Sequence, residues 1–211
     1  MDLKEISLAV QKGKRKDVKA LVEQALSEGM EVQDILDNGL ISAMNVVGED
    51  FKNNKIYVPE MLMSARAMTA GVDILSPLMS QSGVKAIGTV VIGTVKGDLH
   101  DIGKNLVAMM MRGKGITVYD VGTDAPPERF IEKAKEVNAD IICLSALLTT
   151  TMPAITDVLD ALKADGSREK YYVMIGGAPV TQAFADQVGA DAYTADAATA
   201  AEVAESYLSN K

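Results

Sequence analysis

The only histidine of the chain, His100, lies in the stretch GDLHDIGKN at residues 97 to 105. Two residues earlier, the carboxylate of Asp98 can accept a proton from one imidazole nitrogen, which leaves the lone pair of the other nitrogen available to a metal ion. A loop histidine can equally cap a helix or bond a backbone carbonyl, so the spacing alone leaves both interpretations open. A conventional zinc site needs three or four protein ligands, and the chain has no second histidine and a single cysteine. A metal ion bound by His100 must therefore bring most of its ligands with it.

Glycines surround this stretch and end a later apolar run. Gly97 and Gly103 flank the histidine, and Gly93 lies in the apolar run before it. Gly176 and Gly177 follow a second run, YYVMI. Positions without side chains allow a flat or bulky ligand to approach the backbone closely, although glycine also commonly ends strands.

Hydroxyl side chains lie at the end of a third apolar run, ADIICLSAL at 139 to 147, and just after it; they are Ser145, Thr149, Thr150 and Thr151. One interpretation is a polar slot for a ligand. The other is a cap for the helix predicted from Met152, since Pro153 suits the first turn of a helix.

The composition is that of a globular chain. Of 211 residues, 48% are hydrophobic and 24% are charged, which provides enough apolar material for a core. The net charge is −8 and the Lys and Arg residues are scattered, so we expect no nucleic-acid partner. No segment has the length that a signal peptide or a membrane span requires, so we expect a cytoplasmic protein with no membrane partner. Cys143, inside an apolar run, is expected to be a buried, inert thiol.

The apolar pattern changes near residue 85. Before it, apolar residues recur at intervals of three and four, which predicts a bundle of about four helices, at 3–13, 18–29, 32–51 and 59–79. After it, amphipathic stretches alternate with short β-branched runs, which predict strands at 86–95, 116–122, 139–147, 171–177 and 191–194. We expect a helical bundle cap domain at 1–83 and an α/β domain at 84–211, joined by a linker near 81–86.

The predicted fold class is α/β, with a flavodoxin-like or Rossmann-like five-stranded parallel sheet. In a sheet of order 2-1-3-4-5, ligands bind outside the carboxyl ends of the first and third strands, where the winding reverses. The histidine follows the first predicted strand, the hydroxyl residues lie at the end of the third, and the glycine pair ends the fourth. Three strand ends therefore predict one ligand site.

Three motifs resemble a known signature in order and spacing: Asp98-x-His100-x-x-Gly103, Ser145-x-Leu147 and Gly176-Gly177. They resemble the corrinoid-binding signature of cobalamin-dependent methyltransferases, which include the cobalamin-binding module of methionine synthase and the small corrinoid proteins of methyl transfer systems. The string DLHDIGKN is closer to this branch than to the adenosylcobalamin mutases. GEDFKNNKIYVPEMLMSARAM, at 48–68, resembles the helical cap of the same family, so the resemblance spans nearly the whole chain.

The resemblance implies that the cofactor is cobalamin, a cobalt corrinoid, held between the cap and the cobalamin-binding α/β domain. In the family, the dimethylbenzimidazole tail leaves cobalt and enters a slot in the α/β domain, and a histidine replaces it as lower axial ligand. Carried over to this chain, His100 is the cobalt ligand and Asp98 holds its other nitrogen. The third member of this relay is usually a serine. The matching residue here is Thr151, which keeps the hydroxyl and adds a methyl group.

The resemblance also implies further groups of cofactor-binding residues. The loop around the ligand contributes Gly97, Leu99, Asp101, Ile102 and Gly103. The tail slot is lined by Ser145, Leu147, Thr149, Gly176 and Gly177. The segment around the nucleotide end contributes Tyr193, Ala195 and Ala197. The cap candidates that face cobalt are Tyr57, Met61, Leu62 and Met68, although plain helix packing explains most of this stripe.

The function implied is that of a corrinoid methyl carrier, a subunit of a cobalamin-dependent methyltransferase system rather than a complete enzyme. Its partners would be a donor-specific methyltransferase, an acceptor methyltransferase that uses tetrahydrofolate or coenzyme M, and a reductive activator. Methanol, methylamines, glycine betaine and aryl methyl ethers all remain open as donors. One alternative is a cobalamin-sensing regulatory module, which needs an output domain. A second is a flavodoxin-like or receiver-like domain without cobalamin, since phosphate-rich ligands use the same switch point.

Overall fold

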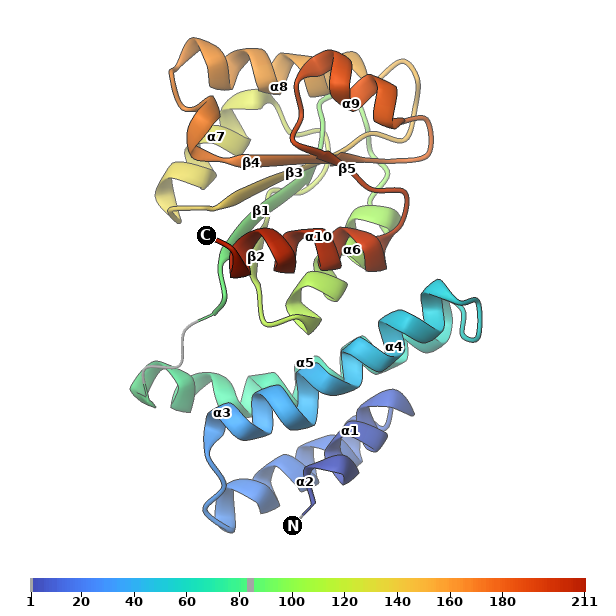
Figure 1. Ribbon diagram of the computed structural model, residues 1–211, viewed down its shortest axis with the longest axis vertical. Helices are drawn as coiled ribbons and strands as arrows, with labels where there is room; N and C mark the ends of the chain where they lie inside the picture. Colours follow the sequence, from blue (N-terminus) through green and yellow to red (C-terminus); the bar gives the residue numbers. More distant parts are fainter. Residues whose placement is uncertain (1, 83–85) are drawn as a thin grey trace. The chain divides into compact units, whose positions relative to one another are not determined.

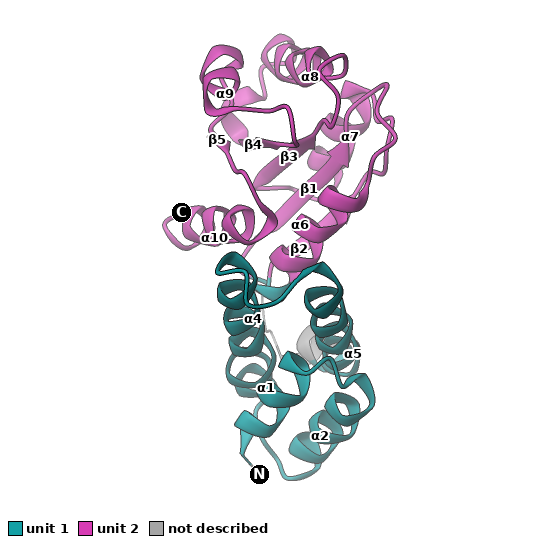
Figure 2. Ribbon diagram, turned by 90° about the vertical axis from the view of Figure 1, so that its right-hand side faces the viewer, with its two compact units in different colours: residues 1–86, 113–115 teal, residues 87–112, 116–211 magenta. Residues whose placement is uncertain are grey.

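The computed structural model describes residues 2–82 and 86–211. The chain divides into two compact units, one of residues 1–86 with 113–115 and one of residues 87–112 with 116–211 (Figure 2). The predicted domain boundary between residues 83 and 84 and part of the predicted linker lie outside the described residues.

The first unit is helical, as predicted (Figure 1). Its elements are α1 (Leu3–Gln11), α2 (Arg15–Ser27), α3 (Val32–Asp34), the π-helix η1 (Ile35–Ile41), α4 (Ser42–Lys52) and α5 (Val58–Ser82). Apolar residues at the predicted spacing are buried, among them Ile6 and Val10 of α1 and Val18 and Val22 of α2. The π-helix was not predicted. Gly39 lies in it, and a Cβ atom there would be 3.3 Å from Cγ2 of Ile6, so the bare backbone permits close packing against α1.

The second unit is the predicted α/β fold. Its strands and helices alternate along the chain as β1 (Thr89–Thr94), α6 (Ile102–Gly113), β2 (Thr117–Asp120), α7 (Pro127–Glu136), β3 (Ile141–Ser145), α8 (Pro153–Ala164), the short 3₁₀ helix η2 (Arg168–Lys170), β4 (Tyr172–Gly176), α9 (Gln182–Val188), β5 (Ala192–Tyr193) and α10 (Ala197–Ser209). All the pairings are parallel and the strand order is β2-β1-β3-β4-β5, which confirms the predicted topology. In Figure 1, α7, α8 and α9 lie on one face of the sheet, and α6 and α10 lie on the other.

The register of the central strands aligns their carboxyl ends. Thr94 of β1 pairs with Ser145 of β3, and Ser145 pairs with Gly176 of β4. The loops that leave these three strands therefore start side by side at one edge of the sheet.

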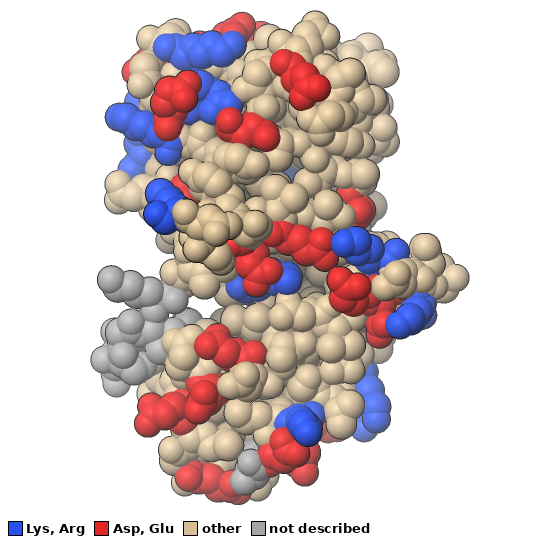
Figure 3. All heavy atoms as spheres, in the orientation of Figure 1, with Lys and Arg blue, Asp and Glu red and all other residues tan. Residues whose placement is uncertain are grey.

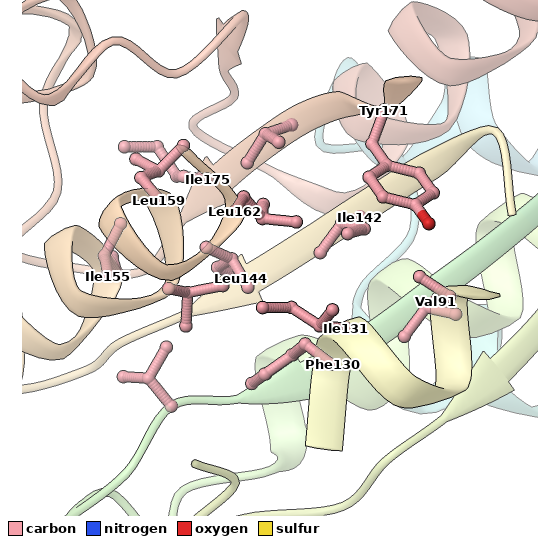
Figure 4. Packing of buried hydrophobic residues seen from close by; sticks show 14 of the residues in the cluster. Val91, Phe130, Ile131, Ile142, Leu144, Ile155, Leu159, Leu162, Tyr171 and Ile175 are labelled. Carbon is pink, nitrogen blue, oxygen red and sulfur yellow. The ribbon is translucent and has the colours of Figure 1, made fainter. Parts of the chain in front are cut away.

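The core between the sheet and two of its helices fixes this edge. Phe130 of α7 and Leu159 of α8 are fully buried, and they pack in one apolar cluster with side chains of the central strands (Figure 4). Gly93 of β1 lies on this face, where a Cβ atom would be 2.7 Å from the ring of Phe130. Its missing side chain is therefore explained by packing.

The structure can be compared with three expectations from the composition: a buried cysteine, scattered basic residues and the lack of a membrane span. Cys143 of β3 is buried, as predicted, and burial raises the pKa of its thiol to about 12. On the face drawn in Figure 3, basic and acidic side chains are interspersed and form no continuous basic field. Within the described part of the chain, none of the helices combines the length and hydropathy that a bilayer crossing would require.

Candidate functional site

The loop that carries His100 leaves β1 and enters α6 at the carboxyl edge of the sheet. Its backbone is fixed near both ends of the histidine residue. The backbone N–H of His100 donates to Oδ1 of Asp98 at 3.1 Å, and its carbonyl oxygen accepts from the hydroxyl of Thr94 at 2.8 Å. Thr94 is the last residue of β1 and is fully buried. The sheet therefore positions the histidine residue directly.

Asp98 is the centre of a buried hydrogen-bond network. Its side chain is 0% exposed. Oδ1 accepts from the His100 backbone and lies 2.7 Å from Nδ1 of the imidazole. Oδ2 accepts from the backbone N–H of Leu147 at 2.7 Å and from the hydroxyl of Thr151 at 2.7 Å. Burial alone would raise the pKa of Asp98, but the hydrogen bonds from Leu147, Thr151 and His100 together hold it well below its usual value.

The ionised carboxylate determines which nitrogen of His100 can act as a ligand. A carboxylate only accepts hydrogen bonds, so Nδ1 must carry the proton that it shares with Asp98. In the neutral imidazole, Nε2 then has the free lone pair. Nε2 has no hydrogen-bond partner among the described residues, and the side chain of His100 is 51% exposed. The loop therefore presents one nitrogen lone pair, that of Nε2, on a half-exposed ring.

Apolar side chains around this histidine face outward. Leu99 is 74% exposed and Ile102 is 73% exposed, and the neighbouring loop after β3 exposes Leu147 and Leu148. Exposed apolar clusters commonly mark surfaces that a ligand or partner covers. Leu148 was not predicted as a site residue, because a leucine in an apolar run is read as core unless the strand end is known.

Thr151 fills the third position of the network without strain. Its hydroxyl lies 2.7 Å from Asp98 and 2.9 Å from the carbonyl oxygen of Leu148, so its one proton can go to either acceptor. Its extra methyl group faces Gly97, where a Cβ atom would be 3.7 Å from Cγ2 of Thr151. The structure thus brings Thr151 to Asp98, and threonine supplies the hydroxyl that serine would.

The glycine pair at the end of β4, Gly176 and Gly177, allows two strand ends to approach closely. A Cβ atom on Gly177, whose φ is +128°, would be 1.8 Å from the carbonyl oxygen of Ala146, so no other residue fits there. A Cβ atom on Gly176 would be 3.3 Å from the carbonyl oxygen of Thr194. With Ser145 beside Gly176, the predicted tail-slot residues of β3 and β4 do lie together.

The remaining predicted cofactor-binding residues of the α/β unit differ in burial. Thr149 is exposed in the turn before α8, Ala195 is exposed, Tyr193 ends β5 half-buried, and Ala197 is buried at the start of α10. Asp101 is exposed and accepts from Asn105, and Gly103 has open space where a side chain would be.

The cap candidates divide by burial. Met61 and Met68 of α5 are buried, Leu62 is half-buried, and Tyr57 is exposed before α5 begins. Burial of the two methionines is what helix packing predicts. Their role toward a cofactor stays a prediction.

Two residues that make hydrogen bonds at this edge, Lys104 and Asp124, were not predicted from the sequence. The ammonium group of Lys104, buried in the first turn of α6, bonds Asp120 at the end of β2 and Oδ1 of Asn105. Asp124, in the loop after β2, bonds the histidine loop twice. The sequence offered only one indication of these contacts: the loop after β2 leaves the sheet at the same edge as the loop that carries His100. Among the described residues there is no group of three or more His, Cys, Asp or Glu that could hold a metal ion.

Comparison with known proteins identifies the family of the chain. Two family models described as "B12 binding domain" match the chain, one at residues 88–204 and one at residues 2–76. Dimethylamine corrinoid protein 2 of Methanosarcina acetivorans is 48% identical over 210 residues, which cover 99% of this chain and 97% of the relative. A corrinoid protein of Desulfitobacterium hafniense is 40% identical over 209 residues, 98% of this chain and 97% of the relative.

Solved structures agree with these matches. A chain of the methanol:cobalamin methyltransferase complex MtaBC from Methanosarcina barkeri superposes with a TM-score of 0.89 at 32% identity, covering 99% of this chain and 80% of that chain. A cobalamin-binding protein from Desulfitobacterium hafniense superposes with a TM-score of 0.80 at 30% identity, covering 98% of both chains. The alternative of a flavodoxin-like or receiver-like domain without cobalamin is therefore wrong. The chain has cobalamin as its cofactor and belongs to the B12-binding corrinoid proteins of methyltransferase systems.

Proposed function

We propose that this chain is a cytoplasmic methyl carrier that binds cobalamin with the dimethylbenzimidazole tail off the metal and His100 in its place. It passes a methyl group from a donor-specific methyltransferase to an acceptor methyltransferase that uses tetrahydrofolate or coenzyme M. The observation that carries the proposal is the bond between ionised Asp98 and Nδ1 of His100, which leaves Nε2 as the ligating nitrogen of a half-exposed ring.

The residues at the carboxyl edge fit this cofactor. When bound, cobalamin supplies the cobalt that accepts and releases the methyl group. Asp98 keeps the proton on Nδ1 and so presents the lone pair of Nε2. Leu99 and Ile102 offer apolar surface to a large macrocycle, and covering them removes that surface from water. Gly103 leaves open space at the start of α6, where a side chain would otherwise project.

The bare strand ends support a slot for the displaced tail. Ser145 provides a half-buried hydroxyl at the end of β3, and the glycines of β4 keep the neighbouring backbone free of side chains. In this proposal, Tyr193, Ala195 and Ala197 border the nucleotide end of the tail. The division into a cap domain at 1–83 and a cobalamin-binding domain at 84–211 also belongs to the proposal, and the family matches at 2–76 and 88–204 support it.

The donor system that we propose is one for methylated amines. Dimethylamine corrinoid proteins of Methanosarcina are 44% to 48% identical to this chain over nearly its whole length. The solved methanol complex shares 32% identity, which makes methanol the next donor to test.

Reconstitution with hydroxocobalamin tests the ligand exchange. The visible spectrum should show a bound corrin with its benzimidazole displaced, and His100→Ala should lose the imidazole ligand while the protein keeps its fold. A corrin that retains its own benzimidazole on cobalt in the unmodified protein would overturn the proposal.

Methyl transfer separates a carrier from a cobalamin sensor. The reduced, reconstituted protein is mixed with a methyltransferase for dimethylamine, methanol or glycine betaine together with that methylated substrate, and methylation of the corrin is followed by its visible spectrum. We expect methylation with the dimethylamine enzyme and its substrate. Stable cobalamin binding without methyl transfer from any of the three enzymes would favour the sensor.

A further inference from the structure

Asp124, in the loop between β2 and α7, holds the histidine loop by two hydrogen bonds. Its backbone N–H donates to the carbonyl oxygen of Asp98 at 2.9 Å. Its carboxylate oxygen Oδ1 accepts from the backbone N–H of Gly97 at 2.7 Å. The two peptide groups on either side of the Gly97–Asp98 step are thus both bonded to a single residue that lies 27 positions away from Gly97 along the chain.

The backbone of Asp124 has a conformation that is unfavourable for most residues other than glycine. Its φ is +49°, in the left-handed region that residues other than glycine avoid. The nearby turn residues Gly97 and Gly122, with φ of +84° and +85°, are both glycines. Asp tolerates this region better than most residues, but glycine would be the unstrained choice. A carboxylate at this position is therefore explained by the bond that it makes to Gly97.

The loop that carries Asp124 is itself fixed on both sides. Before it, the backbone N–H of Gly122 donates to Asp120, and the carbonyl oxygen of Gly122 accepts from Thr94 at 2.9 Å. After it, the backbone N–H of Ala125 donates to the carbonyl oxygen of Thr94 at 3.0 Å, and Pro126 restricts the backbone that follows. A residue held between two such anchors can transmit the position of the sheet to the histidine loop.

We propose that Asp124 is a positioning residue for the cobalt ligand. It does not touch the imidazole; it fixes the Gly97–Asp98 turn, and Asp98 in turn aims the ring of His100. This inference rests on the proposed role of His100 as lower axial ligand. It predicts that loss of the Asp124 carboxylate makes the orientation of the His100 ring, and so the direction of the Nε2 lone pair, more variable. No group that contacts His100 is removed.

The test compares three variants. Asp124→Gly keeps the backbone conformation and removes the carboxylate. Asp124→Asn restores an oxygen acceptor for Gly97 and tolerates the same φ. Asn138→Gly is the matched control, since Asn138 is also exposed, also has φ of +49°, and follows α7 away from the site. Each variant is grown with ¹⁵N-histidine, reconstituted with unlabelled cobalamin, reduced to the cobalt(II) form, and analysed by EPR for the two-line splitting from the labelled imidazole.

The ratio of histidine-bound to histidine-free cobalt should fall about tenfold in Asp124→Gly, as for the loss of one charge-assisted hydrogen bond. It should recover largely in Asp124→Asn and stay unchanged in Asn138→Gly. An unchanged ratio in Asp124→Gly, with histidine on cobalt in the unmodified protein, would overturn the inference alone. Absence of imidazole splitting in the unmodified protein would instead overturn the proposed function.

A second measurement needs no cofactor. Because His100 is the only histidine, selective ¹⁵N labelling gives the NMR signals of this one ring in the apo protein. In the unmodified protein and in Asn138→Gly, the shifts should report a single tautomer with the proton on Nδ1. Asp124→Gly should show shifts averaged toward the other tautomer. A purely structural role for Asp124 would lower the thermal midpoint of unfolding and leave the tautomer unchanged.

Discussion

The helix-covered face of the sheet buries apolar side chains, whereas its carboxyl edge buries a charged side chain and exposes apolar ones. Under α7 and α8, apolar side chains such as Phe130 and Leu159 are fully buried. At the edge, the carboxylate of Asp98 is buried, and Leu99, its neighbour in the chain, is the most exposed large apolar residue of the described part. The first arrangement stabilises the fold. The second leaves apolar surface in water beside a buried carboxylate, and exposed apolar surface of this kind commonly marks a place that a ligand or partner covers.

The largest expected effect lies in the helix-covered core. Phe130→Ala should lower the free energy of unfolding by about 3–5 kcal/mol, because it removes a fully buried ring and leaves a cavity beside Gly93. Urea unfolding of the apo protein measures this loss. The fraction that remains folded should still bind cobalamin with histidine on cobalt. If that folded fraction lost the histidine ligand, the core would also determine cobalt coordination, which would contradict the separation of the two regions.

The next effect lies at the buried acid of the edge. Asp98→Asn should cost about 3 kcal/mol of stability, because both oxygens of Asp98 accept hydrogen bonds and the NH2 group of Asn would face donors in place of one of them. It should also lose the histidine ligand from the corrin. Asp101→Asn is the matched control: it changes an exposed acid in the same loop and should alter stability by less than about 0.5 kcal/mol. Equal effects of the two variants would show that burial of Asp98 is irrelevant.

A smaller effect is expected at the hydroxyl of the network. Thr151→Val keeps the shape of the side chain but removes the donor to Asp98, which should cost about 1–2 kcal/mol in thermal or urea unfolding. Thr151→Ser should stay close to the unmodified protein in stability and in the spectrum of the bound corrin. Thr150→Ala changes the exposed neighbour and should have almost no effect. If Thr151→Ser lost the histidine ligand, the methyl group against Gly97 would matter more than the hydroxyl.

The smallest effect on stability is expected at the exposed apolar rim. Leu99→Ala should change the free energy of unfolding of the apo protein by less than about 0.5 kcal/mol. Its affinity for cobalamin, measured by equilibrium dialysis, should fall roughly tenfold, as for the loss of about 1–2 kcal/mol of apolar contact. Unchanged affinity would show that the exposed leucine does not contact the cofactor.

The fold was predictable from the sequence because its signals are local. Runs such as TVVIG at 89–93 are long enough to indicate buried parallel strands, and the spacing of Ile6 and Val10 marks the buried side of α1. The π-helix at Ile35–Ile41 was not predictable, since one inserted residue leaves the spacing of apolar residues nearly unchanged.

The site was predictable only in part. Asp98 and His100 are two residues apart, so their contact could be inferred from the chain itself, and Thr151 was matched through the family motif. Asp124 and Lys104 bond partners that are 27 and 16 residues away, and nothing in their local sequence specifies those contacts. Only the parallel register, which brings the β2 loop to the same edge as the histidine loop, reveals them.

The most direct test of the account uses its single histidine. The protein is grown with ¹⁵N-histidine, reconstituted with unlabelled cobalamin and reduced to cobalt(II), and the EPR spectrum is recorded. Coordination by His100 predicts that each cobalt line is split into two by ¹⁵N, in place of the three lines from ¹⁴N in unlabelled protein. A three-line pattern that persists in the labelled protein would show that the nitrogen belongs to the cofactor's own benzimidazole, and it would contradict the central claim.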